Sequence, residues 1–306
     1  MSITFCGVEL AHPIINGSGT FDAIAAVRAF GDGLRESFPF SAYVSKTITL
    51  QPRAGNPPPR LWEAQSGLIN SIGLPNKGLD GYIREDLPEL ARLLRAPASG
   101  ARVGAGERDV PLITNVMGAT AEELAQLVEA CDARAEIAAV ELNVSCPNVR
   151  TGLDIGADPR QLEEVVRAVR PRTTKPLIVK LTPNTADVAL CAQAAAAGGA
   201  DAVALINTLR ATALAPGARA GGERWLGGGT GGLSGPAIRA VALAQVAAVA
   251  ARVEIPVIGM GGVQSSLHAR QFLDVGATLV AVGTESFRDP AAGASIAAGL
   301  DAVRGA

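Results

Sequence analysis

The chain contains 306 residues, of which 48% are apolar and 18% are charged, and its formal net charge is −2. This near-neutral charge argues against nucleic acid or a membrane surface as the main partner, and no apolar run approaches the ~20 residues needed to span a bilayer. The first 19 residues lack the basic start and the apolar centre of a signal peptide, so we expect a cytoplasmic protein.

The length suits one large α/β barrel as well as two ordinary domains, but no linker or change of composition divides the chain. We therefore expect residues 1–306 to form a single domain. The four cysteines lie at least 15 positions apart, and there are only two histidines. This spacing offers no Cys-x-x-Cys clip for zinc or an iron–sulfur cluster, so we expect no metal site on this chain.

Short apolar runs alternate with helical patterns, which is typical of strand–helix units around a parallel sheet. The predicted strands cover residues 14–16, 42–46, 112–116, 137–143, 177–180, 202–207, 257–259 and 279–282. The predicted helices cover residues 23–30, 79–94, 121–131, 159–170, 186–197, 236–251, 265–275 and 290–303. These eight repeats favour a closed (β/α)8 TIM barrel, an α/β fold with active sites at the carboxyl ends of its strands. A doubly wound open sheet is the alternative.

Two segments are too long for plain barrel connections. Residues 47–76 contain three consecutive prolines and Trp62, and residues 210–235 are rich in glycine. Long connections in compact domains are usually lids or binding loops. We expect extended loops after the second, fourth and sixth strands, and a tolerated surface insertion at residues 99–109.

The segment Glu141-Leu-Asn-Val-Ser-Cys-Pro-Asn148 follows an apolar run that reads as a buried strand. Proline cannot continue a strand ladder and restricts the residue before it, so the strand should end near Pro147. Cys146 would then lie at the carboxyl end of a strand with amide side chains on either side. This position favours a reactive thiol, although a structural cysteine is the alternative.

Other polar residues also follow predicted strands, namely Lys46, Thr47, Asn115, Asn143, Lys180, Asn207 and Thr208. Lysines buried inside a barrel need an anionic partner, which indicates a bound anion or an anionic ring system. The last two strands run into Gly261-Gly262 and Gly283-Thr284, where barrels often bind phosphate. A phosphate-bearing cofactor, two strand-end lysines and an isolated thiol fit an enzyme that uses flavin mononucleotide (FMN).

Several motifs resemble those of the class 1 dihydroorotate dehydrogenases. They are residues 46–60, Asn70-Ser-Ile-Gly-Leu74, Asn143-Val-Ser-Cys-Pro-Asn148, Lys180-Leu-Thr-Pro-Asn184, Gly231-Gly-Leu-Ser-Gly-Pro236 and Ile258-Gly-Met-Gly-Gly262. The resemblance covers nearly the whole chain and is greatest to the catalytic subunit of the two-subunit, class 1B branch. Thr182, where serine is common, and the long segment 211–229 depart from the family pattern, and the latter puts substrate preference in doubt.

The resemblance implies FMN-dependent oxidation of (S)-dihydroorotate to orotate in the pyrimidine pathway that leads to UMP. Cys146 would remove the C5 proton while hydride passes from C6 to flavin N5. The substrate residues would be Lys46, Asn70, Ser71, Ile72, Gly73, Leu74, Asn143, Asn207 and Thr208. The FMN residues would be Ser18, Lys46, Thr47, Asn115, Asn143, Lys180, Ile206 and Gly235, with Gly261, Gly262, Gly283 and Thr284 at the phosphate.

The resemblance also implies partners. Class 1B members pair with a second subunit that carries FAD and a [2Fe-2S] cluster and passes electrons to NAD, so we expect a homodimer of this chain or a heterotetramer with that subunit. A class 1A enzyme would use fumarate instead. Two further alternatives are a dihydropyrimidine dehydrogenase-like enzyme acting on uracil or thymine, and a Schiff-base aldolase with Lys180 as its nucleophile.

Overall fold

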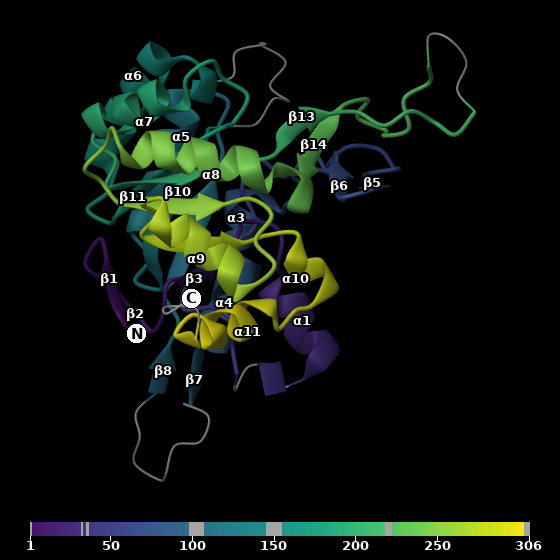
Figure 1. Ribbon diagram of the computed structural model, residues 1–306. Coiled ribbons are helices and arrows are strands. Elements are labelled where there is room, and N and C mark those ends of the chain that lie inside the picture. The colour runs from purple at the N-terminus through teal and green to yellow at the C-terminus, as the bar shows by residue number, and fades with distance from the viewer. Residues whose placement is uncertain are drawn as a thin grey trace.

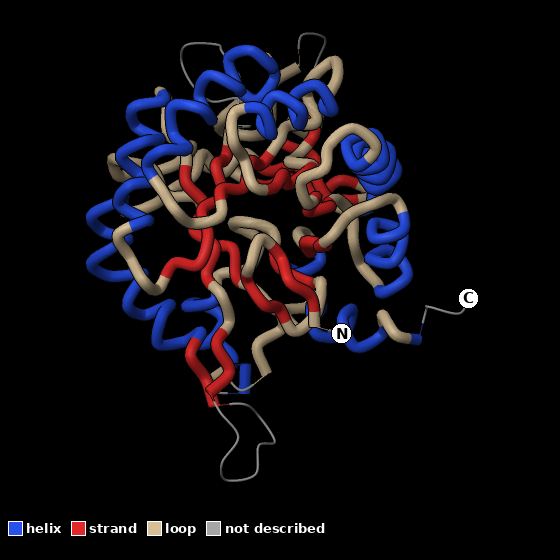
Figure 2. Tube along the Cα trace, turned by 90° about the vertical axis from the view of Figure 1, so that its left-hand side faces the viewer, coloured by secondary structure: helices blue, strands red, loops and turns tan. Residues whose placement is uncertain are grey.

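A barrel of eight parallel strands forms the centre of the protein (Figures 1 and 2). The computed structural model describes residues 2–31, 33–34, 37–97, 107–144, 155–217 and 222–302. The barrel strands follow the order β3 (Ile14–Asn16), β16 (Leu279–Val282), β15 (Val257–Met260), β12 (Ala202–Leu205), β11 (Leu177–Lys180), β10 (Ile137–Asn143), β9 (Leu112–Val116) and β4 (Tyr43–Val44). The predicted (β/α)8 TIM barrel is therefore confirmed.

A side chain joins the two ends of this sheet. Asn16, fully buried on β3, accepts a hydrogen bond from the backbone N–H of Val44 on β4 at 2.8 Å and donates one to the Val44 carbonyl at 2.8 Å. The backbone N–H of Ser41 adds a bond to the carbonyl of Ile14 at 3.0 Å. One amide thus satisfies both backbone groups of Val44 that face β3, where a strand ladder would otherwise be needed.

The barrel interior is filled by small and branched apolar side chains. Alternate residues along the strands form one buried cluster, which includes Ile15, Ile113, Ile178, Ala204 and Ile258. Phe5 and Leu10 belong to the same cluster, because the hairpin of β1 (Ile3–Phe5) and β2 (Val8–Leu10) covers the amino-terminal end of the barrel. That end is therefore closed, and ligands must enter from the other one. The sequence interpretation missed this hairpin.

Helices surround the strands, as Figure 2 shows. They are α1 (Ala23–Phe30), α3 (Gly78–Gly81), α4 (Leu87–Leu94), α5 (Ala121–Asp132), α6 (Pro159–Val169), α7 (Val188–Ala197), α8 (Arg239–Ala250), α9 (Ser266–Asp274), α10 (Glu285–Arg288) and α11 (Ala292–Gly299). Short helical turns are η1 (Tyr82–Asp86), η2 (Ile155–Ala157), η3 (Arg170–Arg172) and η4 (Pro236–Ile238). Within the described residues, no helix has the length and apolar character needed to cross a bilayer.

All eight predicted helices have a counterpart: α1 has the predicted bounds, and the others have shifted ends. The predicted helix 79–94 is interrupted by the π-helical turn η1, and the helix predicted at 290–303 is shorter, because α11 ends at Gly299. Thr120 caps α5 by accepting from the Glu123 N–H. Asp187 caps α7, because its carboxylate accepts from the N–H groups of Ala189 and Leu190.

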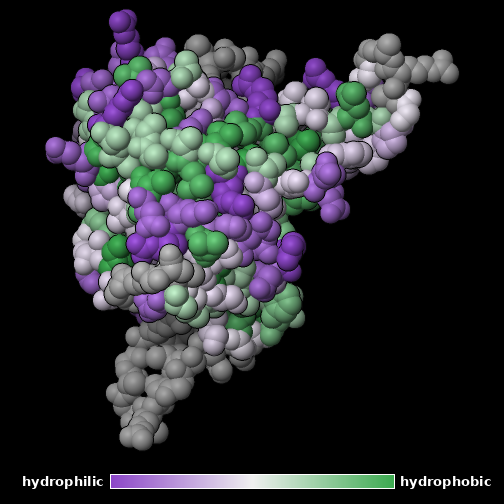
Figure 3. Space-filling view, viewed as in Figure 1, coloured by the Kyte–Doolittle hydropathy of each residue, from purple (hydrophilic) through white to green (hydrophobic). Residues whose placement is uncertain are grey.

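The two long connections do not form irregular loops. They contribute β5 (Leu61–Ala64) with β6 (Gly67–Asn70), and β13 (Leu209–Ala211) with β14 (Gly231–Ser234), to one antiparallel four-stranded sheet. The chain between β13 and β14 projects from the body of the molecule (Figures 1 and 3). Residues 99–106 of the predicted insertion lie outside the described residues, and its end is β8 (Glu107–Asp109), paired with β7 (Arg95–Pro97).

We predict that Asn16→Ala lowers the free energy of unfolding by about 2–4 kcal/mol, since it leaves two buried backbone groups of Val44 without partners. Urea titration followed by circular dichroism measures this change. Ser41→Ala is the matched control at the same seam: its hydroxyl also donates to the Ile14 carbonyl, but the Ser41 N–H keeps that oxygen paired. Equal midpoints for the two variants would contradict the closing role of Asn16.

Candidate active site

A cavity of about 450 Å3 lies at the carboxyl ends of the barrel strands, beneath the antiparallel sheet. Its size is within the range of small-molecule sites. Each predicted substrate residue lines it, as does each predicted cofactor residue except Asn115. Cys146 belongs to residues 145–154, which lie outside the described part of the chain.

The charged residues in the described lining are all cations: Lys46, Lys180 and Arg210. The chain as a whole carries a formal charge of −2, so positive charge is concentrated at this cavity. A ligand that fits such a lining is itself anionic, because Lys180, which is buried, needs a counter-charge.

Lys180 and Lys46 differ in their surroundings. Lys180 is only 6% exposed, and no acidic side chain pairs with it among the described residues. Lys46 is exposed, contrary to our expectation of two buried lysines. The reason is that β4 ends at Val44, two positions earlier than predicted, so Lys46 lies in the connection at the rim of the cavity.

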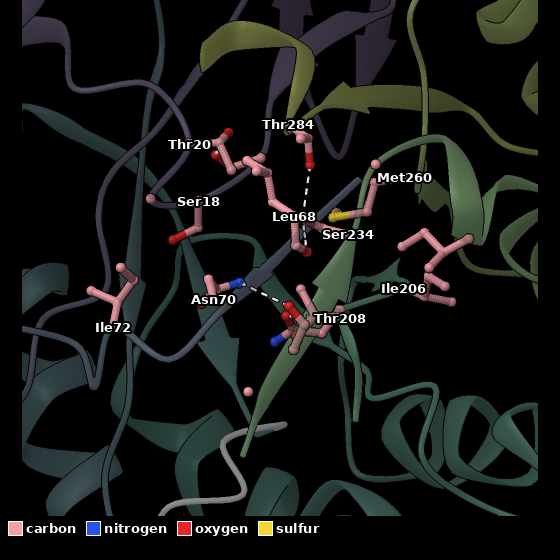
Figure 4. A pocket seen from close by; sticks show the side chains of 18 of the residues that line it. Ser18, Thr20, Leu68, Asn70, Ile72, Ile206, Thr208, Ser234, Met260 and Thr284 are labelled. Atoms are coloured by element: carbon pink, nitrogen blue, oxygen red, sulfur yellow. Dashed lines mark hydrogen bonds between the residues drawn. The ribbon is translucent and has the colours of Figure 1, made fainter. Parts of the chain in front are cut away.

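Hydroxyl and amide groups from separate connections interact around the cavity. The Ser18 hydroxyl donates to the carbonyl of Ser45 at 2.8 Å, and the Asn143 amide donates to the Thr47 hydroxyl at 3.3 Å. On the other side, the Thr284 hydroxyl donates to that of Ser234 at 2.9 Å (Figure 4). The first two bonds join barrel-end segments to one another, and the third joins the end of the barrel to β14 of the antiparallel sheet.

Glycines after the last two strands bring bare backbone to the cavity. Gly261 and Gly262 have φ angles of +139° and +70°. An added Cβ at Gly262 would lie 2.8 Å from the carbonyl oxygen of Gly235, so a side chain is excluded there. At Gly283, by contrast, an added Cβ would meet only the Thr20 methyl group, at 3.7 Å. The space beside this backbone suits a phosphate group bound by N–H donors.

Asn115 lies next to the cavity lining instead of in it. Its amide nitrogen donates to the buried carboxylate of Glu141 on the neighbouring strand β10, while its Oδ1 atom is buried and has no hydrogen-bond partner within the described ranges. An unpaired buried acceptor is costly, so this atom is suited to a ligand N–H.

The sequence interpretation did not identify the inner face of the antiparallel sheet. Its register places Arg210, Gly232, Asn70 and Leu61 in one row across the four strands, and all four line the cavity. Additional lining residues that we did not predict include Thr20, Leu68, Asn184, Met260 and Phe287. The alternation of residues in 61–64 and 67–70 could have indicated strands, but not which segment they pair with.

A polar network supports the backbone at Gly262 from outside the cavity. The Arg239 guanidinium donates to the Gly262 carbonyl at 3.2 Å and contacts His268 Nδ1 at 3.1 Å. The Gln264 N–H also donates to that nitrogen, at 3.3 Å. Partial burial and the Arg239 charge lower the pKa of His268 below its usual 6.5, and Glu285 opposes the shift. Neutral His268 therefore fits this position.

A parallel-stranded barrel with a cationic, glycine-rimmed cavity at its carboxyl end defines a barrel enzyme that binds an anionic ligand. Residues 1–303 match the family model described as dihydroorotate dehydrogenase. Curated relatives named "Dihydroorotate dehydrogenase B (NAD(+)), catalytic subunit" include those of Geotalea daltonii (42% identical, covering 98% of this chain and 92% of the relative) and Desulforudis audaxviator (41%, covering 98% and 91%).

The chain therefore belongs to the dihydroorotate dehydrogenase family of oxidoreductases, and its similarity is to the class 1B catalytic subunits. Both parts of this resemblance were predicted from the motifs and are confirmed.

We predict that the melting temperature falls more steeply on acidification in the wild type than in His268→Gln. The folded protein holds the His268 pKa below 6.5, so the unfolded chain binds more protons in that range and the stability from neutral His268 is lost as the pH drops below about 6.5. Scanning fluorimetry from pH 7.5 to about 5 measures the slopes. A His268→Gln slope equal to that of the wild type would contradict the network.

Proposed function

We propose that this chain oxidises (S)-dihydroorotate to orotate with FMN as its cofactor, in pyrimidine biosynthesis, and that residues 1–306 act as one FMN-binding barrel. The main support is the cavity: the described residues that match the family's substrate and flavin positions line one cationic space, with the single exception of Asn115. No observation of the chain favours the aldolase alternative over this one.

The residues present fit FMN. The open backbone at Gly283 leaves room for a phosphate, to which Thr284 would add a hydroxyl, and Gly261 and Gly262 line the same cavity. Lys180, buried without an acidic partner in the described chain, would stabilise negative charge on a ring system, and Asn115 Oδ1 would accept from a ring N–H. When bound, FMN would supply a two-electron acceptor.

The substrate would occupy the space between the barrel ends and the antiparallel sheet. The amide side chains of Asn70, Asn143 and Asn207 provide donors and acceptors that match the carbonyl and N–H groups of a dihydropyrimidine ring. Lys46 at the rim would pair with the carboxylate, together with the segment 71–74 and Thr208. A neutral uracil or thymine would leave this cationic lining without a counter-charge, which disfavours the dihydropyrimidine alternative.

We assign the base that takes the C5 proton to Cys146, by analogy with the family motif. Two other thiols are unsuited to this role: burial raises the pKa of Cys6 to about 11, with Asp201 adding to the shift, and burial raises the pKa of Cys131 to about 12. Both are therefore protonated at neutral pH, and a protonated thiol is no base.

The name of the relatives indicates the electron acceptor. Their name, a catalytic subunit of an NAD⁺-dependent enzyme, supports a partner subunit that delivers electrons to NAD⁺. By the family resemblance, that subunit would carry FAD and a [2Fe-2S] cluster. We propose a heterotetramer of two such pairs, built on a homodimer of this chain, in the cytoplasm.

The decisive experiment is anaerobic addition of dihydroorotate to the purified, FMN-loaded protein. We expect the flavin absorbance to bleach with dihydroorotate and to persist with dihydrouracil, since only the former carries the carboxylate. Bleaching by dihydrouracil would move the assignment to the dihydropyrimidine branch. A protein that neither contains nor takes up FMN would overturn the proposal.

We predict that Cys146→Ala keeps FMN bound and loses at least about a hundredfold in turnover, a typical contribution of general base catalysis. Single-turnover bleaching measures the loss, and Cys146→Ser should be less impaired because a hydroxyl can still accept a proton. Cys131→Ala, at a buried thiol away from the cavity, is the control and should keep its rate. Unaltered turnover in the Cys146→Ala variant would remove the thiol from the mechanism.

A further inference from the structure

Arg210 is a cavity residue that neither the family motifs nor our sequence interpretation assigns a role. It lies on β13, directly opposite Gly232 on β14, which in turn pairs with Asn70 on β6. Residues directly opposite one another in antiparallel strands share a face. Arg210 therefore shares the cavity face of the sheet with Asn70, a proposed substrate residue.

The position of the Thr208 side chain independently indicates on which side of the sheet the Arg210 side chain lies. An added Cβ on Gly232 would overlap the Thr208 hydroxyl, which shows that the cavity side of Gly232 is covered by the Thr208 side chain. Thr208 and Arg210 are two positions apart on one extended segment, so their side chains leave it on the same side. The side chains of Thr208, Arg210 and Asn70 thus surround Gly232.

The backbone that carries Arg210 is held firmly. Asn184, in the connection after β11, accepts from the Arg210 N–H at 2.8 Å and donates to the Thr208 carbonyl at 3.1 Å. A second bond, from the Asn184 amide to Thr182, fixes this side chain in turn. The guanidinium itself makes no ion pair or hydrogen bond with the described residues, and the described lining contains no acidic side chain that could compete for it.

We propose that Arg210 is a specificity-determining residue that recognises the negative charge of the substrate at the cavity entrance. This inference rests on the proposed function, in which the substrate is a carboxylate. A guanidinium offers two parallel donors that match a carboxylate, and its exposure lets it attract the anion before binding is complete. Because Arg210 lies at the rim, it affects capture of the substrate more than the chemical step.

The test compares Arg210→Gln and Arg210→Glu with Arg224→Gln and Arg224→Glu, in steady-state assays of the FMN-loaded protein with dihydroorotate and an artificial electron acceptor. Arg224 is the matched control, since it is exposed and lies in the connection that follows Arg210, between β13 and β14, but does not line the cavity. We expect KM to rise about tenfold in Arg210→Gln and further in Arg210→Glu, with kcat nearly unchanged, as for loss of one charged contact.

Two further measurements distinguish loss of charge recognition from disruption of the antiparallel sheet. The KM of the wild type should rise with ionic strength, and this dependence should weaken in Arg210→Gln, whereas Arg210→Lys should recover part of the loss because it restores the charge. Both tryptophans of the chain, Trp62 and Trp225, pack edge to face at 5.6 Å in this region. Unchanged tryptophan emission in the variants reports that the sheet is intact.

A wild-type KM in Arg210→Gln, or equal losses in the Arg224 variants, would overturn the role of Arg210 while leaving the proposed function standing. A fall in kcat with altered tryptophan emission would likewise overturn it in favour of a structural role. A wild-type protein that binds FMN but is not reduced by dihydroorotate would overturn both.

Discussion

The side-chain amide of Asn16 closes the barrel, and the position of the cavity depends on that closure. Without a connection between β3 and β4 the eight strands would form an open sheet with two edges, and the residues that follow β3 and β4 would not meet. Ser18 and Thr47 follow these two strands and line the cavity, and their hydroxyl oxygens lie 3.4 Å apart. The Asn16 amide, together with the bonds from Ser41 to the Ile14 carbonyl, therefore positions the site as well as closing the barrel.

Much of the barrel could be predicted from local sequence. Its strands are short apolar runs, and its helices begin at residues such as Thr120 whose side chains accept from the helix backbone, so each element carries its own signal. The ends of the strands were less predictable. Tyr43–Val44 is only two residues long, because the Asn115 N–H bonds to the Ser45 hydroxyl, where a strand ladder would use the Ser45 carbonyl. As a result, Lys46 lies at the rim and not in the expected interior.

The antiparallel sheet could not be predicted because its pairing is not local. Leu209–Ala211 and Gly231–Ser234 contain too few apolar residues to read as strands, and they are ordered by β6, which lies far away in the chain. Arg210 was therefore assigned to a loop. Family motifs identified the residues around it, but motifs say nothing about a residue that they do not contain. Only the register across β13, β14 and β6 places this cation over the cavity.

The bond from the Asn70 amide to the Gly232 carbonyl joins positions 162 apart in the chain. Such long-range pairing is slow to form, since loop closure must be paid for before the contact stabilises anything. A nascent chain that has been synthesised as far as β12 possesses both lysines of the cavity but not its cover. Gly283 and Thr284, which follow β16, also line the cavity, so a ligand that needs the whole lining can bind only after β16 has been synthesised.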